Sequence, residues 1–293
     1  FDSTKLMWNL KDKVVVITGA TSGIGRATAL AIAKHDPKLY LTYRNDKRGK
    51  NLLTQLKKID SNLKIELIKC DFSKQDSIRE CAATINMKAD HIDVLINNAG
   101  IFNVKYRETL EGIENTFAVN HLGYFLFTNL LLDKLKLPEE SRIINVASEA
   151  HDLLNRLNWE NINFSKDYGE GVNAYAQSKL SNLMFTYLLA LRVSINNISV
   201  NAIHPGVINT GIGAQDRSWI GNFLKILLAP FLPRPKDGAT SIIYLATKND
   251  DGITGEYFID CKQAISSSYS KDLEEAQKLW DLSERLVNEE FSI

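Results

Sequence analysis

The sequence predicts an α/β protein with one doubly wound parallel sheet, helices on both faces and a small lobe. Three observations lead to this fold class. Short apolar runs alternate regularly with helical patterns, a glycine-rich turn follows the first run, and no linker, repeat or low-complexity tract interrupts the 293 residues. We therefore expect a single domain over residues 1–293, with residues 209–235 inserted as the lobe.

The first predicted strand, Val14–Ile17, consists of four β-branched apolar residues, which suits a strand buried on both faces. Gly19, Gly23 and Gly25 follow, and a helical pattern covers Arg26–Lys34. A strand, a glycine turn and a helix are the context of a dinucleotide-binding loop, because the backbone can approach a diphosphate and the helix N-terminus offers unpaired N–H groups. A glycine turn without a ligand is the alternative.

The remaining elements follow in order along the chain. Further strands are predicted at Leu39–Tyr43, Leu63–Lys69, Ile92–Ile96, Arg142–Val146, Ile198–Ile203 and near Glu256–Ile259. Helical patterns cover about Lys47–Ile59, Ile78–Ile85, Leu110–Leu135, Tyr175–Val193 and Lys236–Ala246. The opening Phe1–Leu10 is expected to be a surface arm. Because ligands bind beyond the carboxyl ends of parallel strands, one crevice should collect Gly19, Arg44, Asp71, Asn97, Ser148 and Pro205–Gly206.

Composition excludes several classes of protein. The chain is 44% apolar and 24% charged, which is ordinary for a globular domain, and its 35 basic and 35 acidic residues give no electrostatic case for binding nucleic acid. Cys70, Cys81 and Cys261 have no metal-ligand spacing, the five histidines are scattered, and we predict no metal site. An odd number of cysteines without a framework favours a reducing compartment. Because the chain begins with Phe1 rather than Met, an anchor or signal ahead of it is not excluded.

Ser148, Tyr175 and Lys179 are the residues that suggest a reaction. The spacing of Tyr175 and Lys179 puts a phenol and an ammonium on one helical face. A phenol near pKa 10 is a poor catalyst at neutral pH, and a fixed ammonium lowers that pKa. With the Ser148 hydroxyl holding a carbonyl or alcohol oxygen, the group fits proton transfer coupled to hydride transfer with a nicotinamide. The alternatives are a half-buried Tyr, a solvated Lys and a turn cap.

These residues belong to a larger set of motifs in a fixed order. The motifs are Thr18-Gly-x-x-x-Gly-Ile-Gly25, Asn97-Asn-Ala-Gly100, Asn120, Ser148, Tyr175-x-x-x-Lys179 and Pro205-Gly206. Over nearly its whole length the chain resembles the short-chain dehydrogenase/reductase superfamily, which has a Rossmann fold. Stretches such as VNHLGYFLFTNLLLDKLK are similar to its retinol dehydrogenase group.

The resemblance implies a role for each matching residue. Tyr175 would be the acid/base, Lys179 its pKa partner and a ribose ligand, and Ser148 the group that orients the substrate oxygen. Asn120 would hold a water in the proton relay from Lys179. Asn98 would bridge strands and face the cofactor, and Asp71 would meet the adenine edge. The implied cofactor-binding residues are Gly19, Thr21, Ser22, Gly23, Ile24, Gly25, Arg44, Asp71, Phe72, Asn98, Ala99, Gly100, Tyr175, Lys179, Pro205, Gly206, Val207 and Thr210.

Two departures from the group concern the substrate. Glu149 places a charge beside Ser148, and the segment after Thr210 does not match closely.

The end of the second strand indicates which nicotinamide binds. An NAD site requires an acidic residue there for the ribose 2′-hydroxyl, whereas this chain has Arg44, with Lys47 and Arg48 behind it and Asp46 two residues late. A guanidinium suits a 2′-phosphate by charge and geometry. We therefore expect NADP rather than NAD, with a solvated helix start as the alternative.

The stretch 219–232, WIGNFLKILLAPFL, carries one charge and is too short to span a bilayer. It could be a lid over an apolar substrate, a membrane-surface contact, a contact between copies of the chain, or ordinary core. We expect a lid, because the stretch follows Pro205-Gly206 at the mouth of the crevice.

The sequence thus predicts an NADP-linked oxidoreductase acting on the carbonyl or alcohol of a small apolar molecule, such as a retinoid, steroid or lipid aldehyde. The alternative is a catalytically silent cofactor-binding scaffold or sensor. The presence of Asn120, Ser148, Tyr175 and Lys179 together argues against a scaffold. The natural substrate and the favoured direction stay open.

Overall fold

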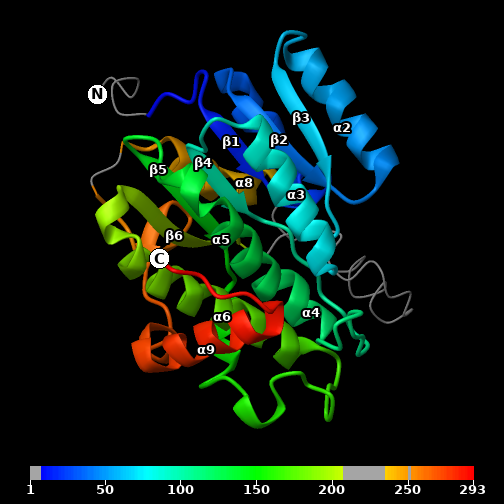
Figure 1. Cartoon of the computed structure of the whole chain (residues 1–293), viewed down its shortest axis with the longest axis vertical. Coiled ribbons are helices and arrows are strands. Elements are labelled where there is room, and N and C mark those ends of the chain that lie inside the picture. The colour runs from blue at the N-terminus through cyan, green and yellow to red at the C-terminus, as the bar shows by residue number, and fades with distance from the viewer. Residues whose placement is uncertain (1–7, 207–234, 250–251) are drawn as a thin grey trace.

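A single eight-stranded sheet forms the centre of the computed structural model, which describes residues 8–206, 235–249 and 252–293 (Figure 1). The strands are β1 (Val14–Ile17), β2 (Lys38–Tyr43), β3 (Lys64–Lys69), β4 (Val94–Asn97), β5 (Ser141–Val146), β6 (Ile198–His204), β7 (Glu256–Ile259) and β8 (Lys262–Ala264). Their order is β3-β2-β1-β4-β5-β6-β7-β8. Every neighbouring pair from β3 to β7 is parallel, and β8 runs antiparallel to β7. The predicted doubly wound parallel sheet is confirmed.

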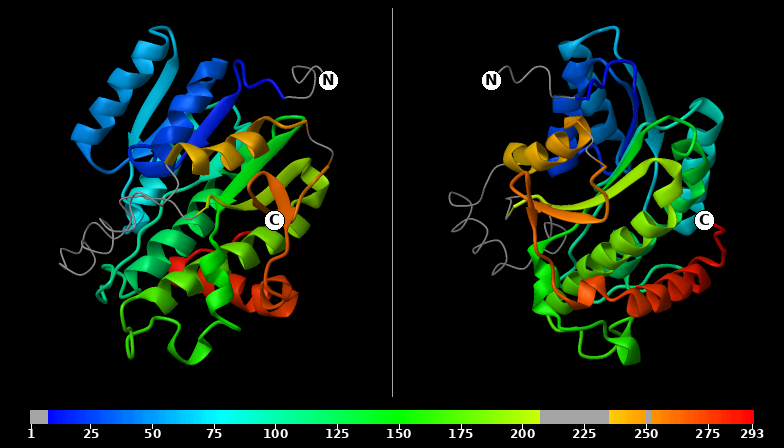
Figure 2. Two further views of the ribbon diagram at one scale, coloured as in Figure 1. Left: turned by 180° about the vertical axis from the view of Figure 1, so that it is seen from behind. Right: turned by 90° about the vertical axis from the view of Figure 1, so that its left-hand side faces the viewer.

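Helices cover both faces of this sheet (Figure 2). They are α1 (Gly23–Ile32), α2 (Asp46–Ile59), α3 (Gln75–Lys88), α4 (Asn115–Phe117), α5 (Gly123–Leu135), α6 (Val172–Arg192), α8 (Pro235–Thr247) and α9 (Leu273–Val287). Successive side chains of a strand point to opposite faces. Val14 and Val16 accordingly pack into the layer under α3, α5, α6 and α9, and Val15 and Ile17 into the layer under α1, α2 and α8.

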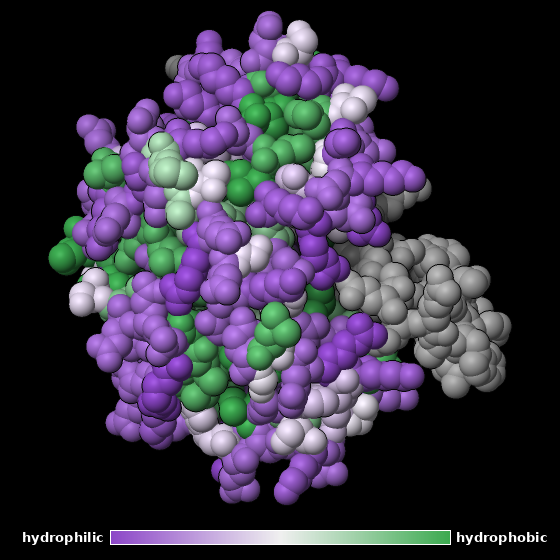
Figure 3. All heavy atoms as spheres, turned by 45° about the vertical axis from the view of Figure 1, so that its right-hand side comes forward, coloured by the Kyte–Doolittle hydropathy of each residue, from purple (hydrophilic) through white to green (hydrophobic). Residues whose placement is uncertain are grey.

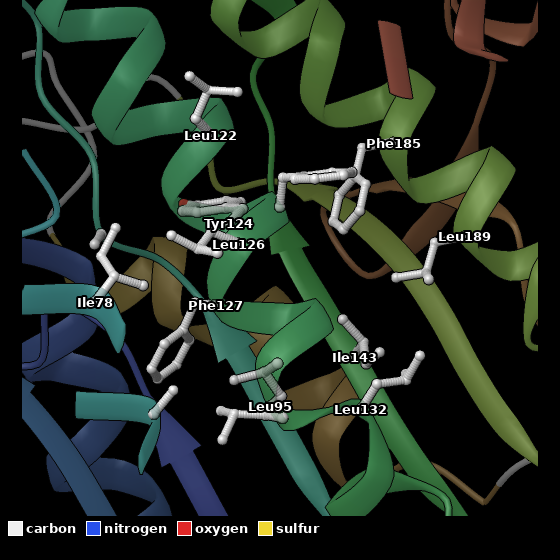
Figure 4. Packing of buried hydrophobic residues seen from close by; sticks show 14 of the residues in the cluster. Ile78, Leu95, Leu122, Tyr124, Leu126, Phe127, Leu132, Ile143, Phe185 and Leu189 are labelled. Carbon is white, nitrogen blue, oxygen red and sulfur yellow. The ribbon is translucent and has the colours of Figure 1, made fainter. Parts of the chain in front are cut away.

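The layer under α5 is the larger apolar core. This layer contains Tyr124, Leu126 and Phe127 of α5, together with Leu95 of β4 and Ile143 of the neighbouring strand β5 (Figure 4). All five side chains are fully buried. Burying a large apolar side chain stabilises the fold by about 1.5–3 kcal/mol, so α5 is held chiefly by packing.

The predicted helix Leu110–Leu135 begins later than expected and is irregular. Regular structure starts with α4 at Asn115, and a π-helical segment, Ala118–Leu122, joins α4 to α5. The amphipathic helix α9 and the three-residue strand β8 were not predicted. The predicted lobe, residues 209–235, lies outside the described residues except for Pro235 at the start of α8.

The expectation that Phe1–Leu10 is a surface arm is wrong for its last part. Leu10 is fully buried and packs in the core under α8. Trp8 is partly buried, donates its backbone N–H to the carbonyl of Thr247, and has the Arg142 guanidinium 4.1 Å from its ring centroid. The backbone hydrogen bond and the packing of Leu10 thus fix the chain before β1 to α8, and the cation–π contact fixes it to β5. Residues 1–7 lie outside the described part.

Hydrophilic side chains dominate the face of the molecule in Figure 3, and the apolar ones lie in small separate groups. None of the helices in residues 8–206, 235–249 and 252–293 is long and apolar enough to cross a bilayer. The three cysteines are free, and the same described ranges contain no cluster of His, Cys, Asp or Glu that could hold a metal.

Leu10→Ala tests the position of the segment before β1. It should lower the free energy of unfolding by about 2–5 kcal/mol, the usual range for truncating a buried leucine. Asn9→Ala is the matched control, because Asn9 is exposed and the change should stay within about 0.5 kcal/mol. Urea denaturation of both variants measures the difference. Equal small effects would mean that Leu10 lies on the surface.

Candidate active site

Two close contacts shape the turn after β1. Gly19 has a φ of +64°, and a Cβ there would lie 2.9 Å from the Cα of Ala99. A Cβ on Gly25 would lie 2.3 Å from Nδ2 of Asn98. Any side chain at either position would separate the loops after β1 and β4, so both positions require glycine.

The residue before α1 does not cap the N-terminus of this helix. The helix begins at Gly23, and Ser22 before it has extended backbone and makes no side-chain cap. Thr21 and Ile24 flank this start. The hydroxyl of Thr42 on β2 accepts a hydrogen bond from the N–H of Gly19 at 3.0 Å and so holds the turn open towards the sheet edge. A glycine cradle with uncapped N–H groups fits the diphosphate of a dinucleotide.

Asn98 forms the second side of the cradle. Its side-chain Nδ2 donates to the carbonyl of Thr18 at 2.8 Å. The hydroxyl of Thr18 accepts from the backbone N–H groups of Asn98 at 2.8 Å and Ala99 at 2.9 Å. Asn98 therefore bridges β1 and β4, as its predicted position required, and Ala99 and Gly100 continue along the same edge.

Arg44 and Asp71 meet beyond β2 and β3. A guanidinium nitrogen of Arg44 lies 3.9 Å from Oδ1 of Asp71, and the Arg44 side chain is 54% exposed. The contact is long and leaves the guanidinium accessible. Phe72 differs, because its side chain is buried in the core with its ring centroid 5.5 Å from that of Phe127. Only the backbone of Phe72 can face a ligand at this edge.

Ser148, Tyr175 and Lys179 come together where β5 ends and α6 begins. Ser148 follows β5, and its hydroxyl oxygen accepts from the N–H of Ala150 at 3.2 Å, which leaves the hydroxyl proton for another partner. Tyr175 and Lys179 lie in the first two turns of α6. Nζ of Lys179 is 5.7 Å from the Tyr175 ring centroid and donates to the carbonyl of Val146 at 2.8 Å.

Burial shifts the pKa of both groups on α6 away from the charged form. It raises the pKa of Tyr175, and a hydrogen bond with Ser148 partly lowers it again. It lowers the pKa of Lys179 to about 7. The sequence led us to expect an ammonium that lowers the pKa of the phenol. In the chain alone Lys179 loses its charge well below the pH at which the phenol ionises, so desolvation dominates instead.

Asn120 lies in the π-helical segment and is fully buried. Its Oδ1 accepts from the N–H of Ile101 at 2.8 Å, and its Nδ2 donates to the carbonyl of Ile101 at 3.0 Å and to the hydroxyl of Ser178 at 3.0 Å. The amide therefore fastens the loop after β4 to α6, and both amide protons are used. Its predicted role in a proton relay stays a prediction.

Several residues that position this edge were not singled out from the sequence. They are Thr42, which holds the glycine turn, Phe102, whose ring meets that of Tyr175 edge-on at 5.5 Å, and His204, which contacts Glu149. Their contacts join parts of the chain that are far apart in sequence, so no local sequence pattern indicated these residues. Pro205 and Gly206 follow β6 at the same edge, and Gly206 has a φ of +82°. Val207 and Thr210 lie outside the described residues.

Several known proteins are similar to this chain over most of its length. The family model for short chain dehydrogenases matches residues 13–221. Human Retinol dehydrogenase 11 is 36% identical over 275 residues, which cover 94% of this chain and 85% of that protein. Mouse Retinol dehydrogenase 14 is 35% identical over 296 residues, with 94% and 86% covered.

Solved structures share the fold. A crystal structure of an uncharacterised protein from Mycobacterium paratuberculosis superposes with a TM-score of 0.76 at 29% identity, covering 98% of this chain and 97% of that one. A short chain dehydrogenase from Shigella flexneri, solved in complex with NADP, has a TM-score of 0.68 at 19% identity over 87% and 99% of the two chains. At that identity the second likeness concerns the fold alone.

Lys179→Met tests the pKa of the buried amine in the cofactor-free protein. The pKa of Lys179 is about 7 when folded, against an ordinary value of 10.5. Between these values the unfolded chain binds more protons, so the free energy of unfolding should rise with pH. The gain is at most about 1.4 kcal/mol per pH unit. Denaturation of both proteins from pH 6 to 10 should show the wild type gaining on the variant, and parallel curves would contradict the lowered pKa.

Proposed function

The chain belongs to the short-chain dehydrogenase family, and from that premise we propose that it transfers a hydride between NADP(H) and the carbonyl or alcohol of a small apolar substrate. The observation that carries the proposal is the meeting, at one edge of the sheet, of the glycine cradle at Gly19 with Ser148, Tyr175 and Lys179. A bound nicotinamide would supply or accept the hydride, and the residues of this chain would handle the proton.

The proposed cofactor contacts follow the sheet edge. The turn Gly19–Gly25 and the N-terminus of α1 would hold the diphosphate, and Asp71 would contact the adenine. Asn98–Gly100 and Lys179 would contact the ribose that bears the nicotinamide. The accessible guanidinium of Arg44 supports NADP, since a 2′-phosphate offers it a bidentate partner. Asp46, the nearest carboxylate of the following helix, is paired with Lys69 at 3.0 Å.

The proposed proton chemistry uses two hydroxyls. During reduction, Oη of Tyr175 gives its proton to the substrate oxygen, and during oxidation the phenolate takes a proton from the alcohol. The Ser148 hydroxyl donates a hydrogen bond to the same oxygen and fixes its position. The ring of Phe102 against Tyr175 offers an apolar contact to the rest of the substrate.

Lys179 must be protonated to favour the phenolate. The negative charge of a bound cofactor favours the ammonium, so we expect the pKa of Lys179 to rise above about 7 on cofactor binding. The protonated Lys179 would in turn lower the pKa of Tyr175, because an ammonium beside the phenol stabilises the phenolate. Cofactor binding and the readiness of the acid/base are linked in this proposal.

The substrate class rests on the relatives and on composition. The similar proteins that bear the name retinol dehydrogenase act, by that name, on an apolar alcohol. The apolar stretch 219–232 is proposed as the lid over such a molecule, and it lies outside the described residues. A silent cofactor-binding scaffold is the second candidate, and it would show cofactor affinity without turnover of any aldehyde in a panel.

Tyr175→Phe tests the acid. The ring stays and the proton is lost, so kcat should fall by at least about 100-fold, the low end for positioned acid/base catalysis. The affinity for NADP should stay nearly unchanged, because the phenyl ring keeps its place in α6. Steady-state kinetics with an aldehyde panel and calorimetric titration of NADP measure the two effects. Near-normal turnover would rule out Tyr175 as the acid.

Arg44→Asp tests the cofactor. It removes the attraction to a 2′-phosphate and adds an acceptor for a 2′-hydroxyl, so preference should move from NADP towards NAD. One charge-assisted hydrogen bond is worth roughly 1.5–3 kcal/mol, about ten- to a hundred-fold in affinity. Lys50→Asp is the control, because Lys50 is exposed on α2, about one turn after the first residue of this helix. A wild type that already prefers NAD would overturn the argument from Arg44.

A further inference from the structure

The turn that carries Ser148 is held by a buried histidine from another strand. His204 ends β6 and is 5% exposed. Its Nδ1 accepts a hydrogen bond from the backbone N–H of Glu149 at 3.3 Å. Its Nε2 lies 2.9 Å from Oε2 of the Glu149 carboxylate. One imidazole therefore holds both the backbone and the side chain of the residue that follows Ser148.

These two contacts fix the protonation state of His204. A nitrogen that accepts from an N–H carries no proton, so Nδ1 is bare and Nε2 carries the proton donated to the carboxylate. Only the neutral Nε2–H tautomer makes both bonds. Protonating Nδ1 would point its N–H at the backbone N–H of Glu149. The hydrogen bond between His204 and the backbone of Glu149 would then be lost.

The path of residues 148–150 decides where the Ser148 hydroxyl lies. The carbonyl of Ser148 is 2.7 Å from Nδ1 of His151, and its hydroxyl oxygen accepts from Ala150. Glu149 lies between Ser148 and Ala150 in the chain. Its side chain is 55% exposed and contacts the sheet at His204. Without His204, the Glu149 peptide could turn and carry the hydroxyl with it.

We propose that His204 is a positioning residue for Ser148, acting through its double contact with Glu149. The inference rests on the proposed function, in which Ser148 orients the substrate oxygen. The proposal also gives the charge of Glu149 a role, because its carboxylate accepts the hydrogen bond from Nε2 of His204.

The groups that face His204 determine the pH range of this contact. They are Glu149, Asp260, His151 and Lys179. Burial lowers the pKa of His204 from its ordinary value of 6.5, the two carboxylates oppose that shift, and His151 and Lys179 add to it. The neutral tautomer therefore persists at pH 7, and the double contact is lost as the pH falls through a value below 6.5.

Three single variants separate the two halves of the double contact. Glu149→Ala removes the carboxylate contact, His204→Asn keeps an acceptor near the place of Nδ1, and His204→Leu removes both contacts. We expect kcat to fall about ten- to a hundred-fold in His204→Leu, since small displacements of a positioning group cost that much, and a few-fold in the other two. The Kd for NADP should change less than about two-fold. His91→Asn is the control, because His91 pairs with Asp93 at 3.0 Å far along the chain from Ser148.

A double variant tests whether His204 acts through Ser148. In a Ser148→Ala background, His204→Leu should reduce kcat by no more than about two-fold further, whereas independent effects would multiply. The decrease of kcat below pH 6.5 should also be smaller in His204→Asn than in the wild type. Multiplying effects, or unchanged kcat in Glu149→Ala and His204→Asn proteins with wild-type unfolding midpoints, would overturn the inference. Turnover that survives Tyr175→Phe would instead overturn the proposed function.

Discussion

The close approach of the loops after β1 and β4 is the constraint on which the rest of the site depends. Thr18 accepts two short hydrogen bonds from Asn98 and one from Ala99 across this contact, and the space left is too small for a Cβ at Gly19 or Gly25. Neither loop can move without leaving buried polar groups unpaired, which costs about 1–3 kcal/mol for each group. The direction in which the glycine turn opens is therefore fixed by the pairing of β1 with β4.

A chain of hydrogen bonds between buried amides and hydroxyls connects this contact to α6, the helix that contains Tyr175 and Lys179. Asn97 donates to Thr128 on α5 and to Asn145 on β5, both at 2.8 Å, and Asn145 donates to Thr186 on α6 at 2.9 Å. All four side chains are fully buried. These three bonds form together only when α5, α6, β4 and β5 lie in one relative position, so they help to set the register of α6 against β4 and β5. Tyr175 and Lys179 sit at the start of the helix that this network locks.

The features that depend on local pattern and on topology could be predicted from the sequence. Strands buried on both faces are recognisable as apolar runs, and the carboxyl ends of parallel strands must meet at one edge, which is enough to place Ser148 near Gly19. Contacts between distant segments could not be predicted. Leu10 is buried by α8, and His204 meets Glu149 across 55 positions. Neither partner carries a local signal of the other, because burial and pairing are decided by packing in three dimensions.

The pKa values of Tyr175 and Lys179 show the same limit and have a consequence for the proposed function. From spacing alone, a neighbouring Lys should lower the pKa of Tyr175, yet burial raises the pKa of the phenol and lowers that of the amine. Both shifts have one cause, since desolvation penalises whichever form is charged. Above about pH 7 the pair therefore consists mostly of two neutral groups when nothing else is bound. A protonated Lys179 favours the phenolate of Tyr175, so in the proposed function an anionic cofactor acts on the acid/base through the ammonium of Lys179.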